Sequence, residues 1–548
     1  MESSGPPRES PYKLKLDFRD RTPSAIIIQG SSFLHCSTME HGPGATLIDR
    51  LQDQALYDHP VRHFQVIETH ISWVLLTGPY AYKIKKPVDL GFLDFSTLDK
   101  RRHYCNEELR LNQRLAPALY LAVIPITGSA SQPELDGKGP VIEYAVKMRE
   151  FAQSAQLDRA LTRDEVHDKH IIDLACSVAQ FHAGAAVASD DSPFGDPTAV
   201  WQPAGQNFER IHPHLDTAAD RSLLDKLQAW STQTHERLSS AWKERKHGGF
   251  IRECHGDMHL GNMALIDDKI MIFDCLEFNE CLRWIDVMSE VAFVTMDLYD
   301  RGRPGLAHRF LNDYLQHSGD YSGLRVLRFY QVYRALVRAK VACLRLAQSG
   351  ISAESRDEIR GHYRQYLRLA EYYTHSTPTP LIITHGLSGS GKTTVSDALL
   401  ESSGAIRIRS DVERKRLFGL APEARSGSGL AADLYSREAS IHTYQRLAEM
   451  ARIVISAGFP VIIDAAFLKQ QQREQFYRLA DDLQVPFVIF HCNAPTALLR
   501  RRLRDRLAQA RDPSEATIQV LDHQLLTQEA LKPDEAKYIF TINAEADM

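Results

Sequence analysis

The sequence predicts a multidomain protein in which an α+β part precedes an α/β part built on a parallel sheet. Two patterns carry this prediction. Strand-like runs gather between residues 60 and 150 and are followed by mostly helical patterns from 155 to 375. From residue 381 onward, short apolar strands alternate with helices, which is typical of a parallel sheet covered by helices. A chain of 548 residues is long enough for two to four domains.

Apolar, β-branched and aromatic residues mark the strands of the first part. We expect strands at Phe64–Glu68, Ile71–Thr77, Tyr80–Ile84, Leu121–Ile126 and Val141–Met148, and a helix at Lys100–Leu115. Helical spacing of apolar residues then predicts helices that include Ile171–His182 and Leu324–Ala347, with an irregular stretch at 251–286 between them. These elements describe a small sheet-rich lobe followed by a larger helical lobe.

In the last part, the expected strands are 381–385, 405–410, 461–465, 487–492 and 538–542. Pro378 and Pro380 mark a linker before the first of them. We therefore divide the chain into a flexible tail at 1–42, a first domain at 43–375, a linker at 376–380 and a second domain at 381–548. Met39 is an alternative start of the protein, because helical periodicity begins just after it.

Composition argues against several classes of protein. Lys and Arg number 65 against 70 for Asp and Glu, a net charge of −5, which disfavours a general role in binding nucleic acid. The eight cysteines are scattered without a C-x-x-C pair, so neither a disulfide framework nor a zinc site is indicated. We see no apolar run of membrane-spanning length and no secretory signal pattern. We expect a cytoplasmic protein that does not bind membranes, and its oligomeric state is left open.

The clearest motif is a glycine-rich loop between an expected strand and an expected helix. Gly386-Leu387-Ser388-Gly389-Ser390-Gly391-Lys392-Thr393, followed by Thr394, has the spacing of a phosphate-binding P-loop. Glycines let the backbone N–H groups turn toward phosphate oxygens, and the following helix adds its positive dipole end. Lys392 would reach the outer phosphates of ATP, and Thr393 would ligate Mg²⁺.

Polar residues near other strand ends would complete this site. Asp464 ends an apolar strand, where a carboxylate acts through Mg²⁺ or on the substrate. Asp411 and Arg414 follow the second strand; the aspartate would accept a proton from the substrate, and the arginine would bind phosphate. Farther along, Arg502 and Arg506 share one helix face at i, i+4 spacing. The neighbouring arginines Arg500, Arg501 and Arg504 are assigned to a solvated face.

A second cluster of oxygen-bearing residues lies in the irregular stretch 251–286. It comprises His255-Gly256-Asp257, then Asn262, then an apolar strand that ends in Asp274. Phosphoryl transfer from ATP needs a carboxylate near the acceptor hydroxyl and separate oxygen ligands for Mg²⁺. Asp257 suits the first role, and Asn262 and Asp274 suit the second.

This second cluster resembles the catalytic and metal-binding segments of aminoglycoside phosphotransferases, which share the two-lobed fold of protein kinases. The resemblance covers roughly residues 60 to 375. It implies that Lys83 contacts the ATP phosphates and that Glu108 is its helix partner, with Lys85 and Glu107 as close competitors. No G-x-G-x-x-G motif precedes Lys83, which disfavours a protein kinase and favours a small hydroxylated acceptor.

The same resemblance implies further positions. Glu143–Met148 would lie at the adenine-binding hinge, with Met148 as a contact of ATP. Ala179–His182 resembles a helix segment common in the family. Asp286 fits a recurring downstream aspartate, which we interpret as a buried bracing residue rather than a catalytic one.

The second domain resembles the compact P-loop kinases related to gluconate kinase, polynucleotide kinase and zeta toxin. This resemblance implies that Arg502 and Arg506 are lid arginines that close over ATP. The whole arrangement resembles bacterial bifunctional aminoglycoside phosphotransferase and ATP-binding proteins. The expected function is therefore transfer of the ATP γ-phosphate to small-molecule hydroxyls at two sites, with ATP and Mg²⁺ as cofactors. Two alternatives stay open: one domain is a regulatory ATP-binding module, or the P-loop domain is a nucleotide or nucleic-acid kinase.

Overall fold

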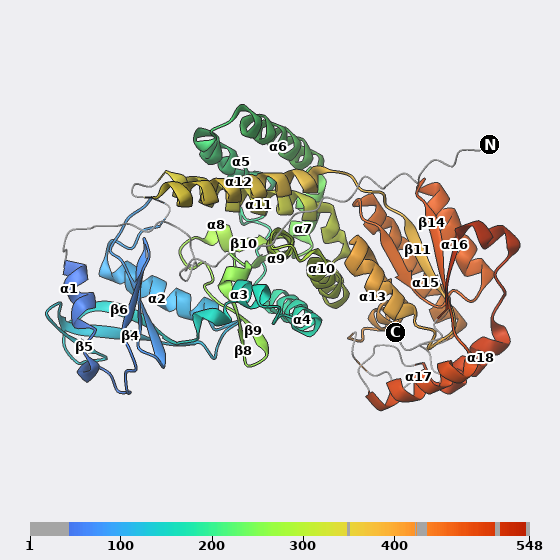
Figure 1. Ribbon diagram of the computed structural model, residues 1–548, viewed down its shortest axis with the longest axis horizontal. Coiled ribbons are helices and arrows are strands. Elements are labelled where there is room, and N and C mark those ends of the chain that lie inside the picture. The colour runs from blue at the N-terminus through green and yellow to red at the C-terminus, as the bar shows by residue number, and fades with distance from the viewer. Residues whose placement is uncertain are drawn as a thin grey trace, which may run out of the picture.

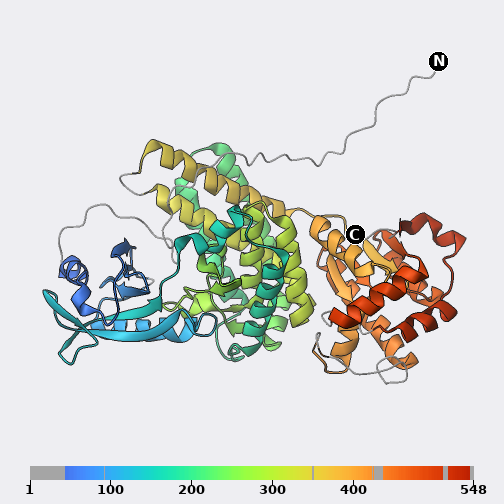
Figure 2. The ribbon, with the colours of Figure 1, turned by 60° about the horizontal axis from the view of Figure 1, so that its bottom comes forward.

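The computed structural model describes residues 43–91, 93–347, 351–421, 424, 436–509 and 516–543. The predicted tail at 1–42, with Met39, lies outside these residues. The predicted fold class is confirmed, since a two-lobed kinase-like fold precedes a P-loop domain with a parallel sheet. Figures 1 and 2 show a sheet-rich lobe in blue, a helical lobe in green and yellow, and the P-loop domain in orange and red, arranged in a row.

A six-stranded antiparallel sheet forms the first lobe, in the order β1-β2-β3-β6-β4-β5. Its strands are β1 (Gln65–Glu68), β2 (Ser72–Leu76), β3 (Tyr80–Lys85), β4 (Tyr120–Ser129), β5 (Gln132–Leu135) and β6 (Val141–Arg149), and α1 (Pro43–Arg50) precedes them. Helix α2 (Leu98–Asn112) lies against β4 and β6, where Cys105 shares a buried cluster with Tyr120 and Val146. It begins at Thr97, whose hydroxyl accepts a hydrogen bond from the Lys100 N–H and so caps the helix.

Helix α9 (Val287–Asp300) forms the centre of the second lobe, because every residue from Val287 to Leu298 is buried. It contacts α10 (Pro304–Ser318) and α11 (Leu324–Leu346), and α10 also lies against α4 (Asp168–Gly184). The other helices are α3 (Leu157–Thr162), α5 (Pro197–Ile211), α6 (Ala218–Arg237), α7 (Ser239–His247), α8 (Glu280–Arg283) and α12 (Ala353–Thr374). Among the described helices, none combines the length and the apolar character that a membrane span requires.

The stretch predicted to be irregular contains two short antiparallel strand pairs. These are β7 (Ile251–Glu253) with β10 (Trp284–Asp286), and β8 (Met263–Ile266) with β9 (Lys269–Ile272). The loop from β7 to β8 contains Asp257, and Asp274 follows β9. The strand pairs therefore hold both ends of the predicted catalytic segment.

The P-loop domain contains a five-stranded parallel sheet in the order β12-β13-β11-β14-β15. Its elements are β11 (Leu381–His385), α13 (Lys392–Ser403), β12 (Ile406–Arg409), α14 (Ser410–Leu417), α15 (Arg437–Ser456), β13 (Val461–Asp464), α16 (Gln470–Asp482), β14 (Phe487–Asn493), α17 (Thr496–Gln509), α18 (Ile518–Thr527) and β15 (Ile539–Asn543). The three strands β11, β12 and β13 are buried along their whole length, as expected of parallel strands covered on both faces. Because β11 lies beside β13, the P-loop and Asp464 meet at the same edge of the sheet.

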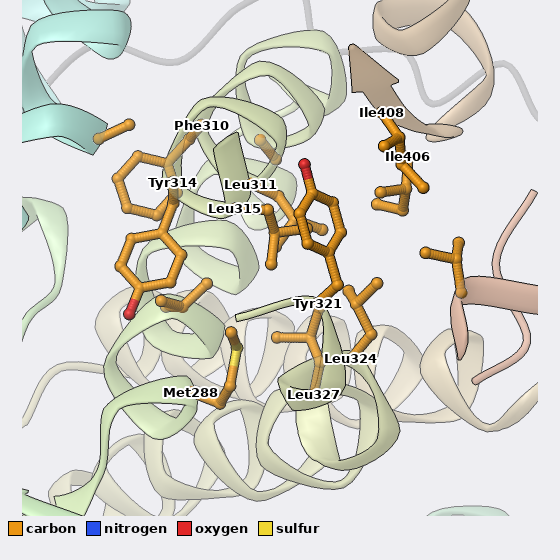
Figure 3. Packing of buried hydrophobic residues seen from close by; sticks show 14 of the residues in the cluster. Met288, Phe310, Leu311, Tyr314, Leu315, Tyr321, Leu324, Leu327, Ile406 and Ile408 are labelled. Atoms are coloured by element: carbon orange, nitrogen blue, oxygen red, sulfur yellow. The ribbon is translucent and has the colours of Figure 1, made fainter. Parts of the chain in front are cut away.

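One hydrophobic core runs from the helical lobe into the P-loop domain. Helix α10 contacts both α13 and β12. Figure 3 shows Leu311, Leu315 and Tyr321 of the helical lobe turned toward Ile406 and Ile408 of β12, and all five side chains belong to one buried cluster. Burial of apolar surface stabilises a protein by about 25 cal/mol per Å². The two domains are therefore joined by a shared hydrophobic core as well as by the linker.

Candidate active sites

Lys83 lies at the centre of a charged cluster between the two lobes of the kinase-like domain. Its Nζ is 2.7 Å from Glu108 Oε1 of α2 and 2.8 Å from Asp274 Oδ1 after β9. Burial lowers the pKa of this amine, but the carboxylates of Asp274, Glu108 and Glu277 outweigh that effect and hold the pKa well above its usual value. Lys83 is therefore a fixed positive charge, as a phosphate-binding lysine must be.

The competing residues occupy different positions in the same network. Lys85 lies two residues along β3, on the same face, and its buried amine contacts Glu277 and lies 2.7 Å from Glu108 Oε2. Glu107 instead accepts hydrogen bonds from Arg110. Of the two lysines, Lys83 is the one that reaches Asp274.

Asp257 lies on the loop between β7 and β8 and is held there by its neighbours. Asn262 Nδ2 donates to the backbone oxygen of Asp257 at 3.0 Å and to its Oδ2 at 3.2 Å. Burial raises the pKa of the Asp257 carboxyl, but His259, Arg334 and Arg338 act against it and bring the pKa below the usual range. Asp257 is therefore ionised at neutral pH and can accept a hydrogen bond from a hydroxyl group.

Asn262 and Asp274 offer oxygen atoms that suit Mg²⁺. Asn262 Oδ1 is buried and has no hydrogen-bond partner among the described residues, whereas its Nδ2 is fully used. The backbone oxygen of Asn262 accepts a hydrogen bond from Phe273 N at 2.9 Å, which brings Asp274 alongside. Asp274 adopts a left-handed backbone conformation with φ of 64°, a strained geometry of the kind that clusters at functional sites. Hard oxygen ligands with an unpaired acceptor fit a magnesium ion.

Buried polar groups hold the loop that carries Asp257 in place. Gly256 N donates to Glu290 Oε1 at 2.5 Å, and Glu290 in turn lies 3.1 Å from His182 Nε2. Asp286 caps α9 and forms a two-point ion pair with Arg245, which also binds Asp320. Asp286 is therefore a buried residue that braces the start of α9. His182 contacts the catalytic segment through Glu290.

Met148 lies near the end of β6, where it packs with Val74 and Ala81. The whole span Glu143–Met148 belongs to β6, so the segment predicted as a hinge is a central strand of the sheet. The connection to the helical lobe begins after Arg149.

The P-loop turns between β11 and α13. A Cβ atom at Gly386, where φ is 150°, would lie 2.4 Å from the backbone oxygen of Cys492, so this position needs glycine. Gly391, with φ of 93°, caps α13. Lys392 Nζ donates to the backbone oxygens of Gly386 at 3.0 Å and Leu387 at 2.9 Å, across the loop that would receive the phosphates.

The metal-binding candidates of this domain contact each other directly. Thr393 Oγ1 donates to Asp464 Oδ2 at 3.1 Å, and Ser396 Oγ lies 3.5 Å from the same oxygen. Ser390 Oγ in the loop is buried and has no hydrogen-bond partner among the described residues. A hydroxyl and a carboxylate at a helix N-terminus fit Mg²⁺ bound together with phosphates.

The acceptor and lid candidates lie around the same edge of the sheet. Asp411 lies in the first turn of α14 and pairs with Arg414 at 3.2 Å. Arg502 Nη1 donates to Gly389 O in the P-loop at 3.4 Å, whereas Arg500 pairs with Asp522 on α18. The side chain of Arg506 lies outside the described residues.

Sequence reasoning missed three residues that hold these sites. The Tyr120 hydroxyl accepts a hydrogen bond from Asp274 N at 3.2 Å, and Gln524 Oε1 accepts one from Ser388 N at 2.9 Å. Arg409 Nε lies 3.8 Å from Asp464 Oδ2. The first two come from distant parts of the chain and carry no local motif, while the register of Arg409 with Asp464 across β12 and β13 becomes visible only in the sheet.

Comparison with known proteins identifies both domains. Residues 98–330 match a phosphotransferase enzyme family, and residues 381–531 match an AAA domain. The uncharacterized protein Rv2004c of Mycobacterium tuberculosis is 30% identical over 465 residues, covering 84% of this chain and 90% of that protein. The uncharacterized protein Mb2027c of Mycobacterium bovis matches to the same extent.

Solved structures are similar to each domain separately. A choline/ethanolamine kinase family protein from Mesorhizobium loti is 10% identical, covers 61% of this chain and 98% of its own, and has a TM-score of 0.38. A gluconokinase from Sinorhizobium meliloti is 20% identical, covers 32% of this chain and 86% of its own, and has a TM-score of 0.22. The family matches and the relatives together show that this chain belongs to the family of Rv2004c, and that it is a phosphotransferase enzyme with a kinase-like domain followed by a nucleotide-binding P-loop kinase-like domain.

Proposed function

We propose that both domains bind Mg-ATP and that each transfers the γ-phosphate to a hydroxyl group of a small molecule. One shared observation carries the proposal: in each domain a phosphate-binding element directly contacts a candidate metal ligand. Lys83 lies 2.8 Å from Asp274 in the first domain, and Thr393 lies 3.1 Å from Asp464 in the second. None of the described cysteines is joined in a disulfide bond, and the proposal includes a reducing, cytoplasmic location.

In the kinase-like domain, Asp257 receives the hydroxyl group of the acceptor. The ionised carboxylate accepts the hydroxyl proton while the acceptor oxygen bonds to the γ-phosphorus and the bond to the β,γ-bridging oxygen breaks. Lys83 neutralises charge on the phosphates, and Glu108 holds Lys83 in place. Asn262 and Asp274 would hold Mg²⁺, which neutralises charge on the phosphate oxygens when bound. Catalysis then rests on positioning and electrostatics.

In the P-loop domain, Lys392 and the loop amides bind the phosphates. Lys392 would exchange its hydrogen bonds to the loop carbonyls for bonds to the β- and γ-phosphates. Asp411 would prepare the acceptor, and Arg502, already in contact with the loop at Gly389, would close over the nucleotide.

Two single variants test the proposal. Asp257→Asn and Lys392→Ala are compared with matched controls at exposed positions, Asp267→Asn and Lys532→Ala. Consumption of ATP is measured against a panel of sugars, amino alcohols, aminoglycosides, nucleosides and phosphorylated sugars. We expect each variant to lose transfer to one acceptor by about 10²- to 10⁴-fold and to retain transfer to the other.

Other outcomes select the alternatives. If Asp257→Asn leaves all ATP consumption intact, the kinase-like domain is a regulatory ATP-binding module rather than a catalytic one. If the Lys392-dependent activity acts on oligonucleotide ends with a steep dependence on salt, the P-loop domain is a nucleic-acid kinase.

A further inference from the structure

Helix α11 presents a positively charged face beside the loop that carries Asp257. Arg334 Nη1 donates a hydrogen bond to Gly256 O at 3.1 Å, so this face of the helix directly adjoins the catalytic segment. Arg338 follows one turn later on the same face, and Lys340 lies on the adjoining stripe with Tyr333. Arg334 is buried, whereas Arg338 and Lys340 are partly exposed.

Nearby protein groups offset the positive charge of this face only in part: Arg338 interacts with Tyr366, Asp297 and Asp257, and Lys340 with Asp257. Lys340 makes no hydrogen bond or ion pair with any described residue, and Arg338 Nε is buried without a hydrogen-bond partner among them. Arg210 on α5 adds a further charge. Burial, together with the charges of Arg210 and Arg334, lowers the pKa of the Lys340 amine to about 8.

The groups around this face are suited to an anion. Asp297, a buried carboxylate of α9, is already used by Leu260 N at 2.8 Å and by Arg301 at 3.3 Å. Asn207, one turn before Arg210 on α5, is fully buried, and neither atom of its amide group has a hydrogen-bond partner among the described residues. This part of the lobe therefore has hydrogen-bond donors without partners among the described residues, and it has positive charge. The carboxylate of Asp257 is not available to neutralise that charge, because it receives the hydroxyl group of the acceptor.

Like charges in a partly desolvated site repel one another, and a ligand of opposite charge offsets this cost. An amine acceptor would add another positive charge beside Arg338 and Lys340. We propose that the acceptor of the kinase-like domain is a hydroxylated small molecule with a negative group, a phosphate or a carboxylate, which Arg338 and Lys340 bind while the hydroxyl group faces Asp257. This inference rests on the proposed function of Asp257.

The test uses the full chain with Lys392→Ala, so that transfer reports the kinase-like domain. Labelled phosphate from ATP is followed with glucose 6-phosphate and gluconate as anionic acceptors, glucose as a neutral one, and ethanolamine and kanamycin as cationic ones. We expect Asp257-dependent transfer to an anionic acceptor; the two anions distinguish phosphate from carboxylate. Adding Lys340→Gln raises KM for that acceptor at least about tenfold and leaves KM for ATP unchanged, whereas Lys340→Arg restores it. Lys226→Gln, at an exposed position of α6, changes neither constant.

Two results overturn the inference and leave the proposed function standing. These are Asp257-dependent transfer to neutral or cationic acceptors alone, and an anionic acceptor whose KM does not respond to Lys340→Gln. Absence of Asp257-dependent transfer to every acceptor contradicts the proposed function itself, and this inference with it.

Discussion

Leu315 tests whether the two domains share one core. This leucine lies on α10 of the kinase-like domain, is fully buried, and belongs to the cluster that includes Ile406 and Ile408 of the P-loop domain. Truncation of a fully buried leucine to alanine costs about 2–5 kcal/mol, because apolar contacts are lost and a cavity remains. If about 500 residues unfold together, their unfolding entropy converts this loss into a melting temperature lower by about 2–5 °C.

Hydrogen exchange followed by mass spectrometry locates the effect. In Leu315→Ala we expect faster exchange in peptides that cover β12, although the substitution lies in the other domain. Leu227→Ala is the matched control, since Leu227 is equally buried but belongs to a different cluster, formed by α5, α6, α9, α11 and α12. Its effect should be confined to those helices. Unchanged exchange in β12 of Leu315→Ala, together with two separate thermal transitions, would refute the idea of a shared core.

Two further predictions concern buried charge and pH. Replacing Arg245 by Met leaves the carboxylates of Asp286 and Asp320 buried without their counterion, so the free energy of unfolding should fall by about 3–5 kcal/mol in urea; a loss below about 1 kcal/mol would contradict the buried ion pair. His385 precedes the P-loop, and burial lowers its pKa to about 3, so below pH 6.5 the unfolded chain takes up a proton that the folded protein does not. Stability should therefore fall as pH drops from about 6.5 toward 3, and His385→Gln should reduce this slope by up to about 1.4 kcal/mol per pH unit, whereas the exposed His523→Gln should not.

The parallel strands were the most predictable part of the fold. Leu381–His385 begins with an apolar run and precedes a glycine-rich loop, and its predicted and observed limits coincide. Strand β5 was missed because Gln132–Leu135 is mostly polar and contains a proline, which are weak signals for a strand. The short strands β7 and β8 lay within a stretch predicted to be irregular. Strand β7 has only three residues and pairs with β10, which is distant in the sequence, whereas β8 forms a hairpin with the neighbouring β9 across Asp267 and Asp268.

Motif residues were easier to place than the residues that support them. Asp257 and Asn262 are five positions apart on one loop, so a local pattern was enough to predict that they lie together. The choice between Lys83 and Lys85 was harder, because alternate residues of a strand point to the same face and both amines reach Glu108. The catalytic and metal-binding roles of these residues stay predictions until the variants above are measured.

A chain of polar contacts accompanies the shared core and leads to the second candidate metal site. Arg309 of α10 lies 3.6 Å from Asp397 Oδ1 of α13, which accepts a hydrogen bond from Arg407 at 2.8 Å. Arg407 Nη1 also donates to Ser396 Oγ at 3.3 Å, and that hydroxyl lies 3.5 Å from Asp464. These contacts connect a helix of the kinase-like domain to Asp464, and polar networks in a low-dielectric interior reinforce one another. The P-loop and its strand carry the chemical groups of this site, and the first domain is linked to them through this network.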